Sequence, residues 1–341
     1  MMITDSIRPS SYIFSRLPGN IEIELPTTYV KLSGEYTINV YRSDGSLRYT
    51  TTFQNEITDS GIERFTSASS SRWMDRAIFL RYFFPEAQTT DVLFMNNTVG
   101  FEAPYFARKQ IQFRFPVGSL NGEIHQVAVG WGIFSYFSLT DIKDTNGDPV
   151  RLKILPNEYV DLFYTLRMFI PTEEFNFSVL LEGTLHNGVI RTQRINDPTA
   201  ITSGGVNVGW NLAGQNSGTT IGNAPLRAAT GTGPGGDWCS IPLLWDDDQL
   251  SNLLGNVRQV GSFANNSPST ISTVSDSPNS IQTTVFWNLD RGNTANGIGR
   301  MCYRTGNTGR PTTNWNAIFE PRIMKDADRQ LTLIFGIAVR K

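Results

Sequence analysis

Alternating apolar and polar residues limit the folds open to this 341-residue chain more than any other feature of its sequence. The clearest case is residues 35–53, EYTINVYRSDGSLRYTTTF, where every second residue is apolar or Thr on both sides of Asp44 and Gly45. A period of two places these residues on one face of a strand, and Asp–Gly tolerates the positive φ angles of a tight turn. The stretch therefore predicts a β-hairpin with one buried face.

The same period recurs across residues 108–182 and at the C-terminus. In the first segment, strand-like runs follow one another about every 8 to 15 residues with turns between them. This spacing is typical of a sandwich or barrel rather than of strands alternating with helices. At the other end of the chain, RQLTLIFGIAV alternates from Leu331 to Ile337 and predicts a final strand.

One short helix is predicted after residue 58, with an irregular loop as the alternative. Asp59 or Ser60 offers a side-chain oxygen for an N-cap, and Ile62 and Phe65 have helical spacing. The next segment, RWMDRAIFLRYFF, fits either a buried strand or a short helix. The predicted fold class is mainly β: antiparallel β-sandwiches or barrel-like sheets joined by hairpins, with one or two short helices and long Gly/Asn/Ser-rich loops.

The chain is long enough for two average domains or for one large all-β domain with insertions. Prolines interrupt residues 1–34, which we interpret as an extended N-terminal arm for anchoring or subunit contact, with IEIEL as a single edge strand. Residues 35–199 are predicted to form a β domain with a central hairpin block. Residues 200–260 are a loop-rich Gly/Asn segment, and residues 261–341 are strands that complete the β fold.

Composition argues against several partners. A net charge of −2 leaves no basic excess for a nucleic acid, and the apolar runs are too short and interrupted for membrane insertion. The N-terminus has no apolar core of signal-peptide type, which indicates synthesis in a cytoplasm. Cys239 and Cys302 are too few for a disulfide framework; we interpret them as buried thiols, with a single bridge as the alternative.

The stretch DIKDTNGDPV, residues 141–150, raises the question of a calcium loop. Counted from Asp144, oxygen-bearing residues stand at positions 1, 3 and 5, as in an EF-hand. Position 6 is Pro149 instead of Gly, and position 12 is Leu155 instead of Glu. Because Asn146–Gly147 lies between two strand-like runs, we predict a hairpin turn.

Candidate catalytic and metal-binding residues are few. His125 and His186 are far apart in the sequence, no G-x-S-x-G elbow occurs, and a zinc site made with the two cysteines has no close ligand pair. The acidic residues Glu173, Glu174 and 246–248 could form a carboxylate pair or a calcium site, but such runs are usually solvated loops or helix starts. We therefore predict no enzyme activity, no cofactor and no metal.

Tryptophans offer a second kind of site. Large aromatics can form a sugar platform, a β core or a subunit interface. The sequence contains Trp131, Trp210, Trp238, Trp245 and Trp315. From these and the Gly/Asn-rich loops we predict an interaction surface that contains Trp210, Asn211, Trp238 and Trp245.

Three stretches together resemble virion proteins of tailed bacteriophages. TTFQNEITDSGIERF is similar to an opening block of that group. IHQVAVGWG followed by FSLTDIKDTNGDPVRLKILPNEYVDLFYTLRMFIP is similar to a central block. FEPRIMKDADRQLTLIFGIAVRK is similar to a C-terminal strand pair. The blocks recur in order and cover most of the chain from about residue 35 onward, while residues 1–34 have no counterpart.

The resemblance implies a structural protein of the tail, baseplate or tail-fibre apparatus, made in the host bacterial cytoplasm and located in the tail region of the virion. Expected partners are other copies of the chain, other tail or baseplate proteins and a host cell-surface receptor. The alternatives are a receptor- or glycan-binding protein at the tail tip, a head or collar decoration protein, and a glycan depolymerase. The resemblance implies no catalytic residue.

Overall fold

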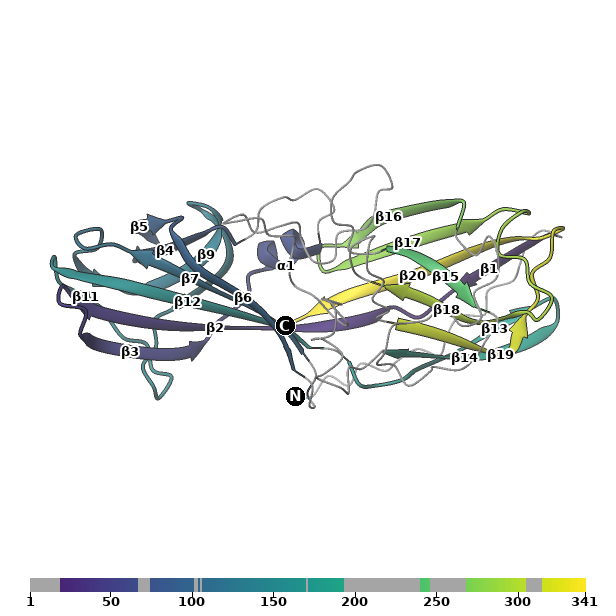
Figure 1. Ribbon diagram of the computed structural model, residues 1–341, viewed down its shortest axis with the longest axis horizontal. Coiled ribbons are helices and arrows are strands. Elements are labelled where there is room, and N and C mark those ends of the chain that lie inside the picture. Colours follow the sequence, from purple (N-terminus) through teal and green to yellow (C-terminus); the bar gives the residue numbers. More distant parts are fainter. Residues whose placement is uncertain are drawn as a thin grey trace.

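The structure is a computed structural model that describes residues 19–66, 74–100, 104, 106–169, 171–192, 240–245, 268–304 and 315–341. Figure 1 shows an elongated molecule in which two β lobes follow one another along the long axis, with the C-terminus between them. The fold is mainly β with antiparallel sheets, and no sheet of the described segments closes into a barrel. The predicted fold class is confirmed in these terms.

One nine-stranded sheet runs through both lobes. Its order is β16-β17-β20-β2-β12-β7-β6, with β1 beside β20 and β3 beside β2. The strands are β1 (Asn20–Glu24), β2 (Thr28–Arg42), β3 (Leu47–Gln54), β6 (Val92–Gly100), β7 (Phe106–Phe115), β12 (Glu158–Phe169), β16 (Thr270–Ser277), β17 (Ser280–Trp287) and β20 (Gln330–Arg340).

In the first lobe, a four-stranded sheet covers the β3, β2, β12, β7 and β6 part of the long sheet. The rings of Phe79 and Phe115 pack with centroids 4.7 Å apart between these two layers. The covering sheet has the order β10 (Ser135–Asp141), β9 (Gln126–Gly132), β4 (Arg76–Arg81), β5 (Phe84–Thr89); β8 (Gly122–Ile124) and β11 (Leu152–Ile154) form a separate pair.

In the second lobe, a five-stranded sheet lies against the β1, β20, β17 and β16 part of the long sheet. Tyr29 and Phe175 join the two layers with centroids 5.7 Å apart. The sheet has the order β13 (Phe175–Leu181), β14 (Thr184–Thr192), β19 (Trp315–Ile323), β18 (Ile298–Arg304), β15 (Ser240–Trp245).

Strand β2 belongs to both lobes. Residues 28–31 pair in parallel with the end of β20, whereas residues 31–42 pair antiparallel with β12. Strand β1 pairs in parallel with the start of β20, so β1 and β2 lie along the same edge of that strand. The antiparallel prediction thus has two exceptions, because β20 returns from the far end of the chain in the same direction as β1 and β2.

The strand predicted at IEIEL is confirmed as β1, which pairs with β20, but the interpretation of residues 20–34 as an arm is wrong. Residues 20–24 form β1, and residues 28–34 form the first part of β2. Ile21, Ile23 and Leu25 are buried in the core. The alternation in IEIEL places one face of β1 inward, and Pro26 falls in the break before β2. The predicted β domain over residues 35–199 also differs from the structure, because β13 and β14 belong to the second lobe. Residues 1–18 and the predicted boundaries near residues 200 and 260 lie outside the described residues.

The predicted turns are present. Gly45 and Gly147 have φ angles of +84° and +90°, and β2 pairs with β3 around the first turn. In the second turn, Asp144 Oδ1 accepts hydrogen bonds from the backbone N–H groups of Asn146 and Asp148. The carboxylate therefore serves the turn itself. The strand that follows, β11, pairs with β8 instead of β10, so the predicted hairpin extends only to the Lys143–Pro149 bridge.

Helix α1 (Asp59–Thr66) is present where predicted, but its N-cap is Thr58. The Thr58 side-chain oxygen accepts a hydrogen bond of 2.8 Å from the backbone N–H of Gly61. Gly61 lies against strand β10, where a Cβ atom would stand 2.2 Å from the carbonyl oxygen of Phe137. The absence of a side chain at residue 61 therefore lets the helix approach the sheet.

We expect Gly61→Ala to lower the free energy of unfolding by up to about 2 kcal/mol. Alanine favours a helix over glycine by about 1 kcal/mol, but overpacking against a backbone oxygen costs about 1–3 kcal/mol. Urea unfolding followed by circular dichroism measures the difference. Glu63→Ala, at an exposed position of the same helix, is the control and should change little. A more stable Gly61→Ala protein would contradict the close helix–sheet contact.

Candidate functional site

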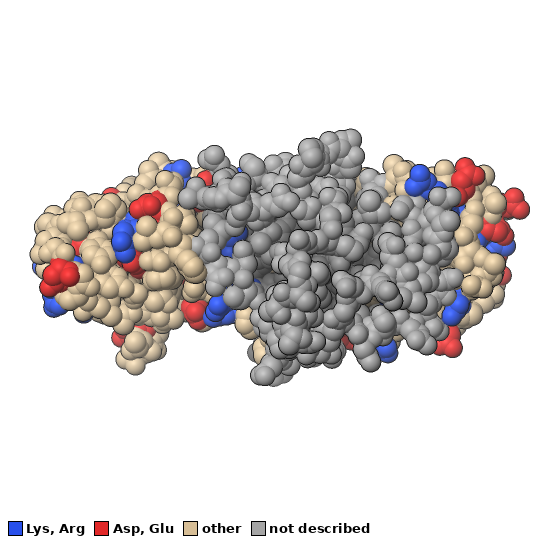
Figure 2. Space-filling model, viewed as in Figure 1, with Lys and Arg blue, Asp and Glu red and all other residues tan. Residues whose placement is uncertain are grey.

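Six exposed apolar side chains gather at the outer end of the first lobe. The turns that carry them meet there because Arg42 of β2 pairs with Glu158 of β12, and because Arg81 at the end of β4 donates to the carbonyl of Glu123 in β8. We call these residues the apolar tip: Leu47, Tyr82, Phe83, Phe84, Val117 and Leu155, each between 42% and 75% exposed. Lys or Arg and Asp or Glu are interspersed on the visible face of this end (Figure 2).

The centre of the apolar tip is the two-residue turn between β4 and β5. Arg81 pairs with Phe84, and the turn residues Tyr82 and Phe83 have φ angles of +48° and +69°. Two consecutive left-handed residues are the conformation of a type I′ turn, where Asn–Gly is the favoured sequence. Bulky residues are strained in this region by about 1–3 kcal/mol each, so other contacts must hold the turn in place.

Gln126 supplies one such contact. This largely buried side chain accepts a hydrogen bond of 3.2 Å from the backbone N–H of Phe83 through Oε1. Its Nε2 donates a hydrogen bond of 2.9 Å to Oδ1 of Asp141 at the end of β10. The Gln126 side chain thus links the backbone of the aromatic turn to the carboxylate of Asp141 on the same sheet.

A cavity of about 340 Å³ lies beside the turn. The Tyr82 ring meets the His125 ring edge to face at 4.0 Å, and the Arg151 guanidinium lies over Tyr82 at 6.0 Å. The cavity is lined by Tyr82, Phe83, His125, Gln126, Asp141, Pro149, Val150 and Arg151. It therefore combines aromatic surface with a carboxylate, an amide, an imidazole and a guanidinium.

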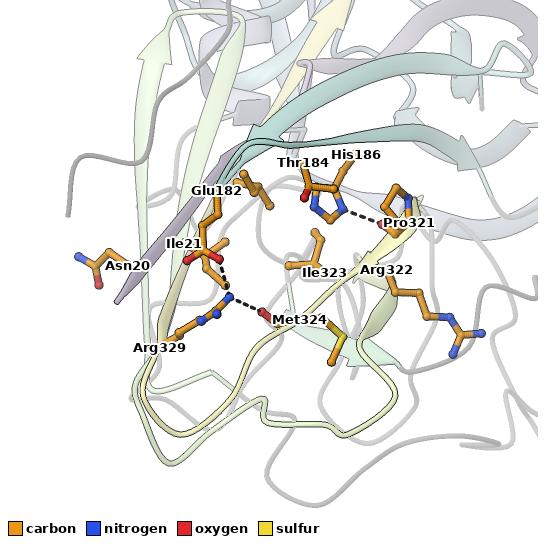
Figure 3. A pocket seen from close by; sticks show the side chains of 11 residues that line it. Asn20, Ile21, Glu182, Thr184, His186, Pro321, Arg322, Ile323, Met324 and Arg329 are labelled. Atoms are coloured by element: carbon orange, nitrogen blue, oxygen red, sulfur yellow. Dashed lines mark hydrogen bonds and ion pairs between the residues drawn. The ribbon is translucent and has the colours of Figure 1, made fainter. Parts of the chain in front are cut away.

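A second cavity, of about 380 Å³, lies at the outer end of the second lobe (Figure 3). Here Arg329 forms an ion pair of 2.9 Å with Glu182, and His186 Nδ1 donates a hydrogen bond of 2.7 Å to the carbonyl of Pro321. Arg329 also donates to the carbonyl of Met324 at 3.5 Å. The side chains of Arg329, Glu182 and His186 are thus already engaged within this cavity.

No family model, curated protein or solved structure matches this chain. Within the described residues, none of the helices has the length and apolarity needed to cross a membrane. The candidate site therefore depends on geometry alone.

The predicted interaction surface falls mostly outside the described residues. Trp210, Asn211 and Trp238 are not among them, and neither are Cys239 and residues 246–248. Trp245 is the last residue of β15, where it pairs with Arg300. Cys302 lies in β18, opposite Leu243.

The two further tryptophans considered as candidates, Trp131 and Trp315, belong to the fold. Trp315 is fully buried. Trp131 packs against the core and carries the guanidinium of Arg64 at 4.9 Å from its ring centroid. Both positions fit the core interpretation of the aromatic residues.

The remaining candidates are not brought together. His125 and His186 lie in different lobes, and Glu174 forms an ion pair of 2.8 Å with Arg191. In the described segments, no group of three or more His, Cys, Asp or Glu side chains could hold a metal ion.

The aromatic turn was missed at the sequence level. The run RYFF was interpreted as the end of a buried strand or short helix, yet β4 ends at Arg81 and the aromatics are exposed. The signal that could have found the turn is Pro85, directly after the run. Proline is confined to edge strands, strand starts and bulges, and here it lies near the start of β5, at the edge of the covering sheet.

Proposed function

We propose that this chain is a structural protein of a tailed-bacteriophage virion, located in the tail, baseplate or tail-fibre apparatus, and that the apolar tip is its contact surface. The observation that carries the proposal is the concentration of six exposed apolar side chains at one end of an elongated body. The three stretches that resemble tailed-phage virion proteins support it from the sequence side.

The composition of the apolar tip fits a contact role. Exposed apolar groups that gather in one patch are typical of binding sites, and Tyr and Phe are enriched in protein interfaces. The fold supports the tip rigidly, because β2 joins the sandwich that carries it to the second lobe through one continuous sheet. The expected partners are other copies of the chain, other tail or baseplate proteins, and the host cell surface. In this proposal the chain has a structural and binding role and no catalytic one.

Labelling of particles tests the location. A phage that lacks this gene is complemented with a tagged chain, and the tag is located on purified particles by gold labelling and negative-stain microscopy. We expect the label on the tail, its baseplate or its fibres. Label on the head or collar, or particles that never contain the chain, would overturn the proposal.

A further inference from the structure

We propose that the cavity beside the aromatic turn binds a sugar ring of a cell-surface glycan. This inference deepens the proposed contact role of the apolar tip and rests on it. The site combines two features that sugar recognition needs, which are an exposed aromatic face and planar polar groups beside it. The contacts described above hold the backbone of the turn, the Tyr82 ring and the Asp141 carboxylate in place.

The aromatic feature is provided by Tyr82 and Phe83, which line the cavity and are 57% and 69% exposed. One face of a pyranose ring carries C–H groups, and burying them against an aromatic ring removes apolar area from water. The turn places these rings without the freedom of an ordinary loop, because Gln126 bonds the backbone of Phe83. A fixed ring loses less conformational entropy when a ligand binds.

The polar feature is provided by Asp141 and Arg151. Asp141 uses one oxygen for Gln126, and a carboxylate can accept several hydrogen bonds, so it retains capacity for ligand hydroxyl groups. Arg151 is a planar donor that lies over the Tyr82 ring. Hydroxyl groups around a sugar ring can donate hydrogen bonds to the Asp141 carboxylate and accept them from the Arg151 guanidinium. The cavity volume of about 340 Å³ is at the lower end of small-ligand sites, which suits one sugar ring.

The charges at the tip favour a glycan over a lipid surface. Segments that insert into anionic membranes carry Lys or Arg beside their apolar residues. Arg151 is a cation beside Tyr82, but Arg81 is neutralised by Glu86 at 3.0 Å, and Asp141 would have to be desolvated beside the inserted rings. Carboxylates of Asp144 and Asp148 lie in the neighbouring turn.

Saturation-transfer NMR tests the inference on the full chain. The probes are the methyl glycosides of glucose, galactose, mannose and N-acetylglucosamine, and the deproteinised surface polysaccharide of the host bacterium. We expect transfer from at least one probe, and a loss of about tenfold or more in affinity for Tyr82→Asn with Phe83→Gly. Those residues suit the turn, so the fold is kept while the rings are removed. Asp141→Asn should weaken binding as well.

The control is Phe134→Ala. Phe134 is 74% exposed on the turn between β9 and β10, at the opposite end of the same sheet, and its removal should leave binding unchanged. Absence of transfer from every probe would overturn the inference, as would unchanged binding by the double variant. So would partition onto phosphatidylcholine–phosphatidylglycerol vesicles, or self-association through the tip, without sugar binding.

The failures of the two proposals are distinguishable. Gold label on the tail combined with no sugar binding would leave the structural role and remove the glycan site. Sugar binding by a chain that labels the head would retain the site and remove the proposed location.

Discussion

Tyr82→Asn combined with Phe83→Gly is expected to raise the free energy of unfolding by about 1 kcal/mol or more. Both residues have positive φ angles, and relief of two strained residues contributes about 1–3 kcal/mol each. Loss of the Tyr82 contacts with His125 and Arg151 offsets part of this gain, by about 1 kcal/mol or more. Urea unfolding of the double variant and the wild type measures the balance.

The control for this experiment is Phe84→Ser. Phe84 is 75% exposed, like its neighbours, but it is paired in β5 and does not have a positive φ angle. Its replacement should change stability by no more than about 0.5 kcal/mol. A double variant that is less stable than the wild type would mean that the ring contacts outweigh the strain. A higher free energy of unfolding for the double variant would show that the wild-type turn is strained and that its exposed aromatic rings reduce stability.

Lys109→Met is expected to stabilise the protein by about 2–3 kcal/mol at pH 7. The Lys109 side chain is 0% exposed, and its Nζ has no hydrogen-bond partner within the described structure. Burial lowers its pKa from 10.5 to about 8, because the charged form loses its hydration. Methionine has a similar length, fills the same space and needs no partner.

The pH dependence provides a second readout. Because the folded state holds this proton less tightly than the unfolded state, the unfolded chain binds more protons between about pH 8 and 10.5. The stability of the wild type should therefore rise with pH across that window, by roughly 3 kcal/mol from Lys109. Lys109→Met should lose this part of the rise. An unchanged pH profile, or a destabilised variant, would show that Lys109 has a partner that offsets its burial.

Lys325 is the matched contrast. Burial also lowers its pKa to about 8, but its Nζ donates to the Asn288 carbonyl at 2.9 Å and to Asn293 Oδ1 at 2.7 Å. Lys325→Met would remove the donor to Asn293 Oδ1 and one of two donors to the Asn288 carbonyl, which also accepts from the Arg291 backbone N–H. This loss, about 1–3 kcal/mol for a buried group, offsets the gain from removing the buried charge, so we expect a smaller change in stability at pH 7 than for Lys109→Met. The two lysines resemble each other in burial and pKa and differ in their partners, so the difference between the two variants would isolate the effect of the hydrogen bonds.

Local patterns were sufficient to predict several parts of the fold. Asp44–Gly45 and Asn146–Gly147 mark turns because few other dipeptides tolerate positive φ, and alternation marks the final strand because one of its faces is buried. Pairing between distant strands has no such local signal. The parallel ladder between β1 and β20 joins residues more than 300 positions apart, and nothing in IEIEL specifies that partner.

The candidate site was harder to predict for a related reason. Tyr–Phe is a poor turn dipeptide, and the turn is held by Gln126, which lies more than 40 residues later in the chain. Trp210 and Trp238 were predicted to belong to an interaction surface because tryptophan often binds sugars or protein partners. The amino-acid composition, however, does not say which aromatic residues are exposed. Exposure of Phe83 and Phe84 follows from where β4 ends, and that end is set by the pairing of β4 with β9.

The shared strand β2 determines how the molecule would carry a mechanical load. Residues 28–31 of β2 are hydrogen-bonded to β20, and residues 31–42 are hydrogen-bonded to β12. Force applied to the tip along the long axis would therefore pass through the β2 backbone into both ladders. Such a pull loads the hydrogen bonds of each ladder in shear, where they resist together rather than opening one after another. A force applied at the tip would therefore be carried to the second lobe by both ladders together.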